Sequence, residues 1–277
     1  KVEIVKLLLE HESIDVNKAN SDNDGGRTPL YRGCYDGVVD IVKLLLAHDA
    51  IDVNKSRTDD GCWTPLYTAC LKEKVEIVKL LLEHKSIDVN IVTTDEGETP
   101  LYKACYKENV ALVKLLLEHE SIDVNKARTN DGRTPLYRAC MDKLVEITTL
   151  LLDHKSIDVN IATTDDGQTP FYKACFNNSI ELVQLLLATE NVDVNKATNN
   201  GQTPFYTACL NGNLNIVKLL LQNEKIDFNQ SRTEDGQTPF YAACSNGYVD
   251  MTNELINSNN NIDITKACTD DGQTPFY

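Results

Sequence analysis

Nine cysteines and five histidines are the residues of this chain whose types best suit chemistry. Thiolates and imidazoles bind zinc, two thiols can form a disulfide, and a thiol beside an imidazole can act as a nucleophile. Each of these roles requires the groups to meet in space. Seven cysteines and all five histidines instead recur about every 35 residues, at Cys34, Cys70, Cys105, Cys140, Cys175, Cys209 and Cys244 and at His11, His48, His84, His119 and His154.

The same period governs the whole chain. All eight prolines lie in one phrase, Thr-Pro-(Leu/Phe)-Tyr, and the steps between copies are 34 to 36 residues. The copies begin at Thr28, Thr64, Thr99, Thr134, Thr169, Thr203, Thr238 and Thr274. A fixed period of this size is typical of a solenoid, in which each repeat stacks on its neighbours.

One repeat predicts a pair of short helices. Asp95-Glu96-Gly97 is a turn signal, and Thr99 can cap a helix whose first residue is Pro100. Apolar residues three and four positions apart follow, and a second apolar pattern predicts a helix from about 110 to 119. Helices of about ten residues are marginal in water, so they must be stabilised by stacking.

These residues resemble the ankyrin repeat family, whose signature phrase is T-P-L-H-x-A. The matching residues are Thr99-Pro100-Leu101-Tyr102-Lys103-Ala104, followed by a Leu-Leu-Leu helix and Asp-Val-Asn. Tyr replaces the usual His in all eight copies, and the usual Gly after the second helix is absent, which predicts a different helix end. The resemblance implies an all-α, curved helix-turn-helix solenoid with β-turn or hairpin loops.

We expect one continuous ankyrin array over residues 1–277. The complete repeats are 24–59, 60–94, 95–129, 130–164, 165–198, 199–233 and 234–269, with partial repeats at 1–23 and 270–277. Solenoids need polar terminal caps, and neither end supplies one, so we expect a fragment of a longer protein.

The repeat predicts that the cysteines and histidines are structural. Adjacent helices pack about 8–10 Å apart, beyond the ~7 Å Cα limit for a disulfide, so the regular cysteines are predicted to be small buried residues. Free thiols fit a reducing, cytoplasmic setting. Cys62 and Cys268 lie outside the pattern and should be reachable by thiol reagents. One histidine per repeat cannot converge on zinc and suits the end of the second helix.

Other catalytic or ligand motifs are missing from the sequence. It has no glycine-rich phosphate loop and no nucleophile elbow, and its acidic turns lack the ligand pattern of a calcium loop. We therefore predict no enzymatic activity, no cofactor and no metal. A net charge of −15 argues against nucleic acid or an anionic membrane as a partner, and no apolar run is long enough to span a membrane.

The predicted partner site is a stripe on the first helices, at positions four, seven and eight after each Thr. The resemblance implies that this stripe, with the turn tips, lines a concave groove. Aromatic residues, Met and Arg are enriched in interface cores. With Trp63 at a turn tip, the predicted groove residues are Arg32, Tyr35, Leu71, Lys72, Lys103, Tyr106, Lys107, Arg138, Met141, Lys173, Phe176 and Leu210.

Two structural interpretations stay open at this stage. The apolar residues at position seven fit either a groove or packing between repeats, and Trp63 either contacts a partner or folds back over its own turn. The resemblance also implies that Asn in Asp-Val-Asn can be hydroxylated, although it can equally make turn hydrogen bonds. The residues concerned are Asn17, Asn54, Asn90, Asn125, Asn160, Asn195 and Asn229.

The predicted function is a scaffold for an acidic or mixed-charge protein or peptide. One alternative is a regulatory segment of a larger enzyme, ion channel or secreted effector. Another is a structural spacer or spring, which would gain support if the residues at position seven were fully buried. The oligomeric state is not predictable from the sequence.

Overall fold

The structure is a computed structural model that describes residues 2–20, 25–58, 61–258, 260–266, 268 and 272–275. Within these ranges the regular secondary structure consists of fifteen helices and no strand. The fold is therefore all-α, as the sequence predicts. The chain divides into two compact units, Lys1–Pro135 and Leu136–Tyr277, and each is described by itself.

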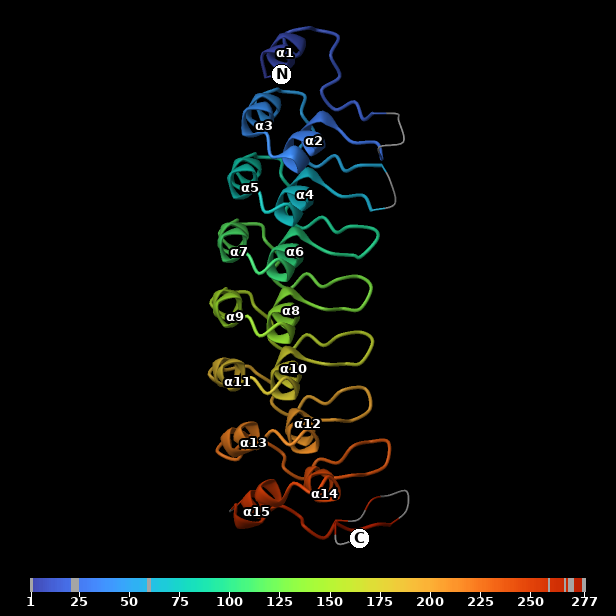
Figure 1. Cartoon of the computed structure of the whole chain (residues 1–277), viewed down its shortest axis with the longest axis vertical. Helices are drawn as coiled ribbons and strands as arrows, with labels where there is room; N and C mark the ends of the chain where they lie inside the picture. Colours follow the sequence, from blue (N-terminus) through green and yellow to red (C-terminus); the bar gives the residue numbers. More distant parts are fainter. Residues whose placement is uncertain are drawn as a thin grey trace. The chain divides into compact units, whose positions relative to one another are not determined.

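The first unit consists of two layers of short helices. In Figure 1 the helices that begin with the Thr-Pro phrase form one layer and the leucine-rich helices form the other, with the connecting loops extending away from both. Its helices are α1 (Val2–Leu9), α2 (Pro29–Asp36), α3 (Val39–Leu46), α4 (Pro65–Leu71), α5 (Val75–Leu82), α6 (Pro100–Tyr106) and α7 (Val110–Leu117). Helices of one layer contact each other in sequence order, α2 with α4 and α4 with α6.

The second unit repeats this arrangement, again with loops on one side of the first helices (Figure 1). Helix α8 (Pro135–Met141) contains the boundary between the units. The others are α9 (Val145–Leu152), α10 (Pro170–Phe176), α11 (Ile180–Leu187), α12 (Pro204–Leu210), α13 (Leu214–Leu220), α14 (Pro239–Ser245) and α15 (Val249–Asn257). Contacts of α10 with α12 and of α12 with α14 form the layer of first helices within this unit.

The first helices begin where the sequence predicts, and the second helices end without Gly, as predicted, although α7 ends two residues early. The Thr99 hydroxyl accepts a 3.0 Å hydrogen bond from the backbone N–H of Tyr102, and Pro100 follows it in the first turn. The second helix of this repeat ends at Leu117 and is followed by Glu118 in a right-handed conformation. The missing Gly thus corresponds to a helix that ends without a left-handed residue.

The regular cysteines lie in the core. Six of them are completely buried, whereas Cys244 is partly exposed, and none of the nine described cysteines forms a disulfide. Burial raises the pKa of Cys140 to about 12 and raises that of Cys70 well above its usual range. These thiols are therefore neutral packing groups. Among the described residues, no three Cys, His, Asp or Glu side chains are grouped closely enough to hold a metal ion.

The prediction that thiol reagents can reach Cys268 is wrong. Its side chain is buried, although turn residues are commonly exposed. The backbone N–H of Cys268 donates to the carbonyl of Gln273 at 2.9 Å, a bond that corresponds to the one between Thr93 and Glu98 in an earlier loop. Cys268 therefore occupies an inward-facing loop position. Cys62, in contrast, is partly exposed.

The first 36-residue step and the 34-residue step arise in the loops that precede the Thr-Pro phrases. One hydrogen bond closes each loop, from Thr93 N–H to Glu98 carbonyl in a typical repeat. The corresponding bond joins Arg57 to Trp63 in the first 36-residue step and Thr198 to Gln202 in the 34-residue step. The first of these loops is one residue longer and contains Cys62 with a φ of 46°, and the second is one residue shorter. The helices therefore keep their register.

No helix in the described ranges has the length and apolar character that crossing a membrane requires. The terminal residues Phe276 and Tyr277, which belong to the predicted partial repeat 270–277, lie outside the described residues.

Candidate functional site

The first-helix stripe is the set of positions four, seven and eight after each Thr. In the first unit, Tyr106 is the most exposed apolar member, with 46% of its surface accessible. Arg32 and Lys72 are also exposed, whereas Tyr35 and Leu71 are half-buried. Complete burial of position seven, which would have supported the spacer interpretation, does not occur here.

Cations lie against the aromatic rings of this stripe. The ammonium of Lys72 lies 4.3 Å from the ring centroid of Tyr35, and that of Lys103 lies 4.6 Å from the centroid of Tyr106. Both distances suit cation–π contact. Lys107 instead approaches the carboxylate of Glu73 at 3.5 Å. The stripe in this unit therefore combines aromatic surface with basic groups that already have internal contacts.

The expectation that Lys103 faces outward is wrong. Lys103 is only 9% exposed, and its ammonium lies 2.6 Å from the carboxylate of Glu98. The hydroxyl of Tyr67 donates to the same carboxylate at 2.7 Å. Burial and this hydrogen bond raise the pKa of Tyr67, so the phenol stays a donor. Lys103 is buried because Glu98 requires a compensating charge.

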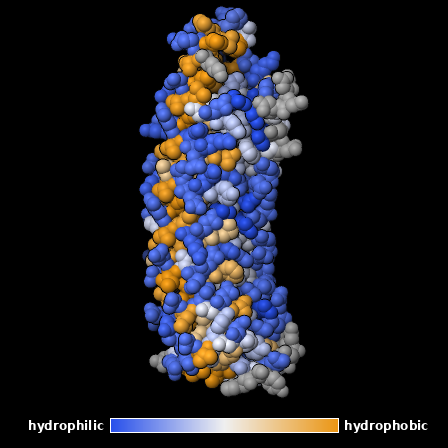
Figure 2. Space-filling view, in the orientation of Figure 1, coloured by the Kyte–Doolittle hydropathy of each residue, from blue (hydrophilic) through white to orange (hydrophobic). Residues whose placement is uncertain are grey.

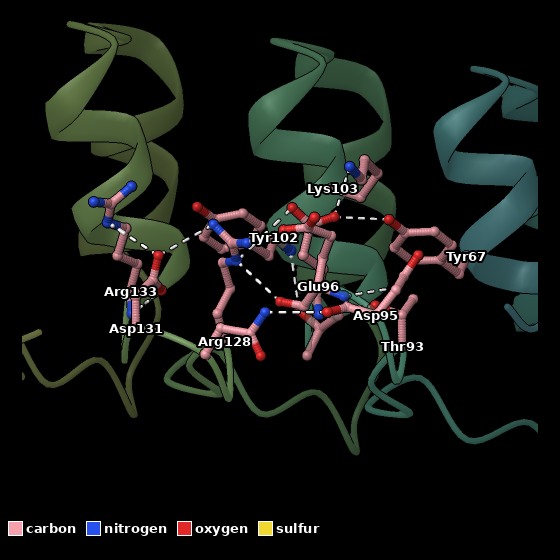
Figure 3. Close-up of polar contacts among 12 residues, drawn as sticks. Tyr67, Thr93, Asp95, Glu96, Tyr102, Lys103, Arg128, Asp131 and Arg133 are labelled. Carbon is pink, nitrogen blue, oxygen red and sulfur yellow. Dashed lines mark hydrogen bonds and ion pairs between the residues drawn. The ribbon is translucent and has the colours of Figure 1, made fainter. Parts of the chain in front are cut away.

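We call these residues, with Glu96, Arg128 and Asp131, the Glu98 cluster. Figure 3 shows Arg128 beside Tyr102, with Asp131 of its own loop on one side and Glu96 of the preceding loop on the other. The guanidinium contacts the carboxylate of Glu96, lies 3.2 Å from Asp131 and 3.9 Å from Glu98, and its Cζ is 5.4 Å from the Tyr102 ring centroid. Sequence analysis missed this cluster, although Glu96 and Asp131 stand at the same position of successive repeats.

The stripe of the second unit is also partly exposed. Phe176 is 45% exposed, stacks on Tyr172 with centroids 6.4 Å apart, and has the ammonium of Lys173 4.7 Å from its own centroid. Arg138 pairs with Asp142 at 2.5 Å. Met141 and Leu210 are half-buried. An aromatic ring with an adjacent lysine is thus the feature that both stripes share.

Behind this stripe, the second unit contains a neutral row that we call the tyrosine–glutamine ladder. Each tyrosine of the Thr-Pro phrase donates its hydroxyl to the glutamine that precedes the next phrase. The bonds are Tyr137 to Gln168 (2.7 Å), Tyr172 to Gln202 (2.9 Å), Tyr206 to Gln237 (3.1 Å) and Tyr241 to Gln273 (3.2 Å). This ladder occupies the position of the Tyr67–Glu98 bond and gives four of the phrase tyrosines a hydrogen bond to the next repeat.

Trp63 folds back over its own loop. Its indole N–H donates to the carboxylate of Asp95 at 3.0 Å, and the guanidinium of Arg57 lies 3.9 Å from its ring centroid. Burial opposes ionisation of Asp95, but hydrogen bonds from the Glu96 amide, Thr93 and Trp63 lower its pKa below the usual range. The indole therefore links two loops, and only part of it is exposed.

The asparagines of Asp-Val-Asn connect successive repeats. The Asn54 amide donates to the Ser86 carbonyl at 2.7 Å, and its oxygen accepts from the backbone N–H of Asp88 at 2.9 Å. The regular histidines make local bonds, since Nδ1 of His84 accepts from the Ser86 N–H at 3.3 Å. These contacts give both residue types structural roles, and hydroxylation of the asparagines stays a prediction.

Apolar side chains on the second helices form a further surface that sequence analysis did not consider. Figure 2 shows hydrophobic residues gathered along the edge that the second helices form in the first unit. Ile4, Leu7 and Leu8 of α1 are at least half exposed, and α1 has no buried residue. The sequence already indicated this exposed apolar surface, because the Val-Glu-Ile-Val-Lys-Leu-Leu-Leu segment of α1 is apolar on more than one face.

Comparison with known proteins gives a consistent result. A model for ankyrin repeats (3 copies) matches residues 1–57, 51–128, 86–165 and 157–232, and one for ankyrin repeats (many copies) matches 216–256. Among solved structures, the crystal structure of the ankyrin repeat domain of Bcl-3, a member of the IkappaB family, is similar with a TM-score of 0.72 and 23% identity. The similarity covers 83% of this chain and all of that domain. No curated protein sequence matched the chain.

Proposed function

Because the chain belongs to the ankyrin repeat family, we propose that it is a scaffold that binds a mixed-charge protein or peptide through its first-helix stripe. Ankyrin repeats generally mediate protein–protein interaction and generally lack catalytic activity. The absence of enzymatic activity in this chain stays a prediction.

The exposed aromatic residues of the stripe carry this proposal. Tyr106 and Phe176 occupy the same repeat position, and each is nearly half exposed although it lies on a helix with a completely buried opposite face. Packing alone would favour burial of these rings. Aromatic residues that combine apolar surface with such exposure are common binding hot spots. Their exposure favours a contact surface over a spacer.

The chemistry of the partner follows from the charges around these rings. Lys72 and Lys173 place ammonium groups within 5 Å of stripe aromatics, whereas Lys103, beside Tyr106, is buried and already pairs with Glu98. An apolar side chain of the partner would cover the ring, and a neighbouring carboxylate would complement the lysine. Because Arg32, Lys107 and Arg138 already pair with Asp36, Glu73 and Asp142, a mixed-charge segment fits this stripe better than a purely acidic one.

Site-specific photo-crosslinking followed by affinity measurement tests the proposal. A benzophenone amino acid at 106 or 176 should capture a partner that the same group at Lys114, exposed on the second helix α7, does not capture. With that partner purified, Tyr106→Ala combined with Phe176→Ala should weaken binding by roughly 30-fold or more, since hot-spot truncation costs about 2 kcal/mol or more. Lys114→Ala should have no effect. Unchanged affinity of the double variant would contradict the proposal.

A further inference from the structure

Two lysines of one turn lie at the C-terminal end of α2 in the first unit. Lys72 follows α4 and Lys74 precedes α5. The ammonium of Lys72 lies 4.3 Å from the ring centroid of Tyr35. Lys74 lies over Gly37, where an added Cβ would be only 3.1 Å from the ammonium nitrogen. Both positive charges therefore lie beside the Tyr35 end of the first-helix stripe.

The acid of this turn contacts the following repeat. Glu73, between the two lysines, has a left-handed φ of 55°. Its carboxylate lies 3.5 Å from the ammonium of Lys107 and accepts a 3.2 Å hydrogen bond from the side-chain amide of Asn109. The turn therefore separates its own charges, because the acid contacts the following repeat and both lysines contact the preceding one.

Neither lysine of the turn has an acidic partner. The other three cations of the stripe in this unit, Arg32, Lys103 and Lys107, each lie within 3.5 Å of a carboxylate. Among the described residues, no carboxylate lies within ion-pairing distance of Lys72 or Lys74. Positive charge that has no internal partner attracts an anionic group of a binding partner.

Hydroxyl groups one helical turn earlier also lack an acceptor. Tyr31 stacks on Tyr35 with ring centroids 6.4 Å apart, and Thr68 precedes Lys72 on the same face of α4. The hydroxyls of Tyr31 and Thr68 are buried and have no hydrogen-bond partner among the residues that the structure describes. This end of the stripe therefore has an excess of donors as well as of positive charge, and both match an anionic oxygen.

We propose that Lys72 and Lys74 bind an anionic oxygen group, a carboxylate or a phosphate, on the segment that binds the first-helix stripe. The inference rests on the proposed function, because it assigns the anion to the same partner. Two ammonium groups can donate to two oxygens of one such group. Position eight of the last three repeats is asparagine, at Asn177, Asn211 and Asn246, so the anion site belongs to the first unit.

Small probes test the site without the partner. N-acetyl-glutamate amide and N-acetyl-phosphoserine amide are titrated into the ¹⁵N-labelled full chain at constant ionic strength, with N-acetyl-glutamine amide as the neutral control. We expect saturable NMR shifts of the Gly37, Lys72 and Lys74 amides, with roughly threefold or tighter binding of an anionic probe than of the neutral one. The anionic probe that binds more tightly identifies the source of the group. Equal shifts with all three probes, or no saturation with either anion, would overturn the proposal.

A matched pair of double variants tests the two lysines. Lys72→Gln with Lys74→Gln should weaken binding of the anionic probes by roughly fivefold or more. Lys79→Gln with Lys85→Gln removes the same charge from exposed side chains of the same repeat and should leave binding unchanged. Full binding by the first variant would contradict the proposal. If that variant loses its dispersed spectrum, the exposed Lys72→Gln alone should still weaken binding, and retained affinity would overturn the assignment.

The outcomes separate this inference from the proposed function. If crosslinking from 106 or 176 captures a partner but the anionic probes do not bind, the scaffold function stands and the lysine site is wrong. With the partner purified, Lys72→Gln with Lys74→Gln should weaken its affinity about tenfold and reduce the salt dependence of binding. Unchanged affinity and salt dependence would likewise overturn the lysine site alone.

Discussion

The Glu98 cluster and the tyrosine–glutamine ladder both provide a hydrogen-bond acceptor for a buried tyrosine hydroxyl, but they use different side chains. In both, a buried tyrosine needs an acceptor from the residue that precedes the next Thr-Pro phrase. Gln202 accepts from Tyr172 without any further charge, whereas Glu98 accepts from Tyr67 and also pairs with Lys103. One change of acceptor, from amide to carboxylate, thus recruits a cation that would otherwise be exposed.

A third variant shows what happens without an acceptor. Trp63 occupies the corresponding position after Tyr31, and its indole can only donate. The Tyr31 hydroxyl is buried and has no hydrogen-bond partner among the described residues. The backbone accommodates Glu, Gln or Trp at this position. The hydrogen bonding behind the first helices therefore differs from one repeat to the next.

The largest expected difference between the units concerns Lys103. Lys103→Thr leaves the buried Glu98 carboxylate with the Tyr67 hydroxyl and with the Arg128 guanidinium 3.9 Å away as its remaining cation. It should destabilise α6 by about 3–5 kcal/mol, the usual cost of breaking a buried ion pair. Lys173→Thr, at the same repeat position beside neutral Gln168, should cost less than about 1 kcal/mol. Native-state hydrogen exchange of amides in α6 and α10 measures both. Equal losses would remove the distinction between cluster and ladder.

The buried cysteines should give the two units the same dependence of stability on pH. Burial raises the pKa of Cys70 and Cys209, whereas unfolded thiols ionise near pH 8.5. Because the folded pKa is the higher one, the stabilisation is complete below about pH 8.5 and is lost as pH rises. Each thiol should lower the free energy of unfolding by about 1.4 kcal/mol per pH unit above that value. Denaturant unfolding from pH 8 to 10 measures the slope, and Cys70→Ala and Cys209→Ala should each reduce it. A flat profile would contradict this.

The smallest expected loss of stability concerns the asparagines of Asp-Val-Asn. Their removal should destabilise the two units equally. Asn54 and Asn195 each bridge to a carbonyl and to a backbone N–H of the next repeat, at 2.7–2.9 Å. Removing these exposed bonds by Asn54→Ala or Asn195→Ala should cost about 1 kcal/mol in either unit. Thermal unfolding of the two variants measures this. A clearly larger loss of stability in one unit would contradict this expectation, because it would show that the loops of that unit couple adjacent repeats more strongly.

Local signals were enough to predict the helices. Thr99 and Pro100 determine where α6 begins, and the spacing of Leu101, Ala104 and Cys105 determines which face is buried, because both depend on residues within one turn. The burial of the cysteines followed from the same periodicity. The second helix of that repeat ends at Leu117, two residues before the predicted end.

Contacts between repeats were not predictable in the same way. Lys103 is on the side of α6 that helical geometry assigns to solvent, and only the buried Glu98 of the preceding loop reverses that assignment. Cys268 was expected to be exposed because it lies in a turn, but the hydrogen bond to Gln273 determines its direction. Both depend on how one loop packs against its neighbour, which a single repeat read in isolation does not contain.

The central claim is that the charge on Glu98 is what holds Lys103 inside. A double-mutant cycle of Glu98→Gln and Lys103→Thr tests it most directly, because the double variant recreates the Gln202 and Thr207 combination found in the second unit. We predict that Lys103→Thr alone is strongly destabilising and that the double variant recovers most of the loss, with a coupling energy of about 2–3 kcal/mol by hydrogen exchange in α6. Losses that simply add would contradict the account.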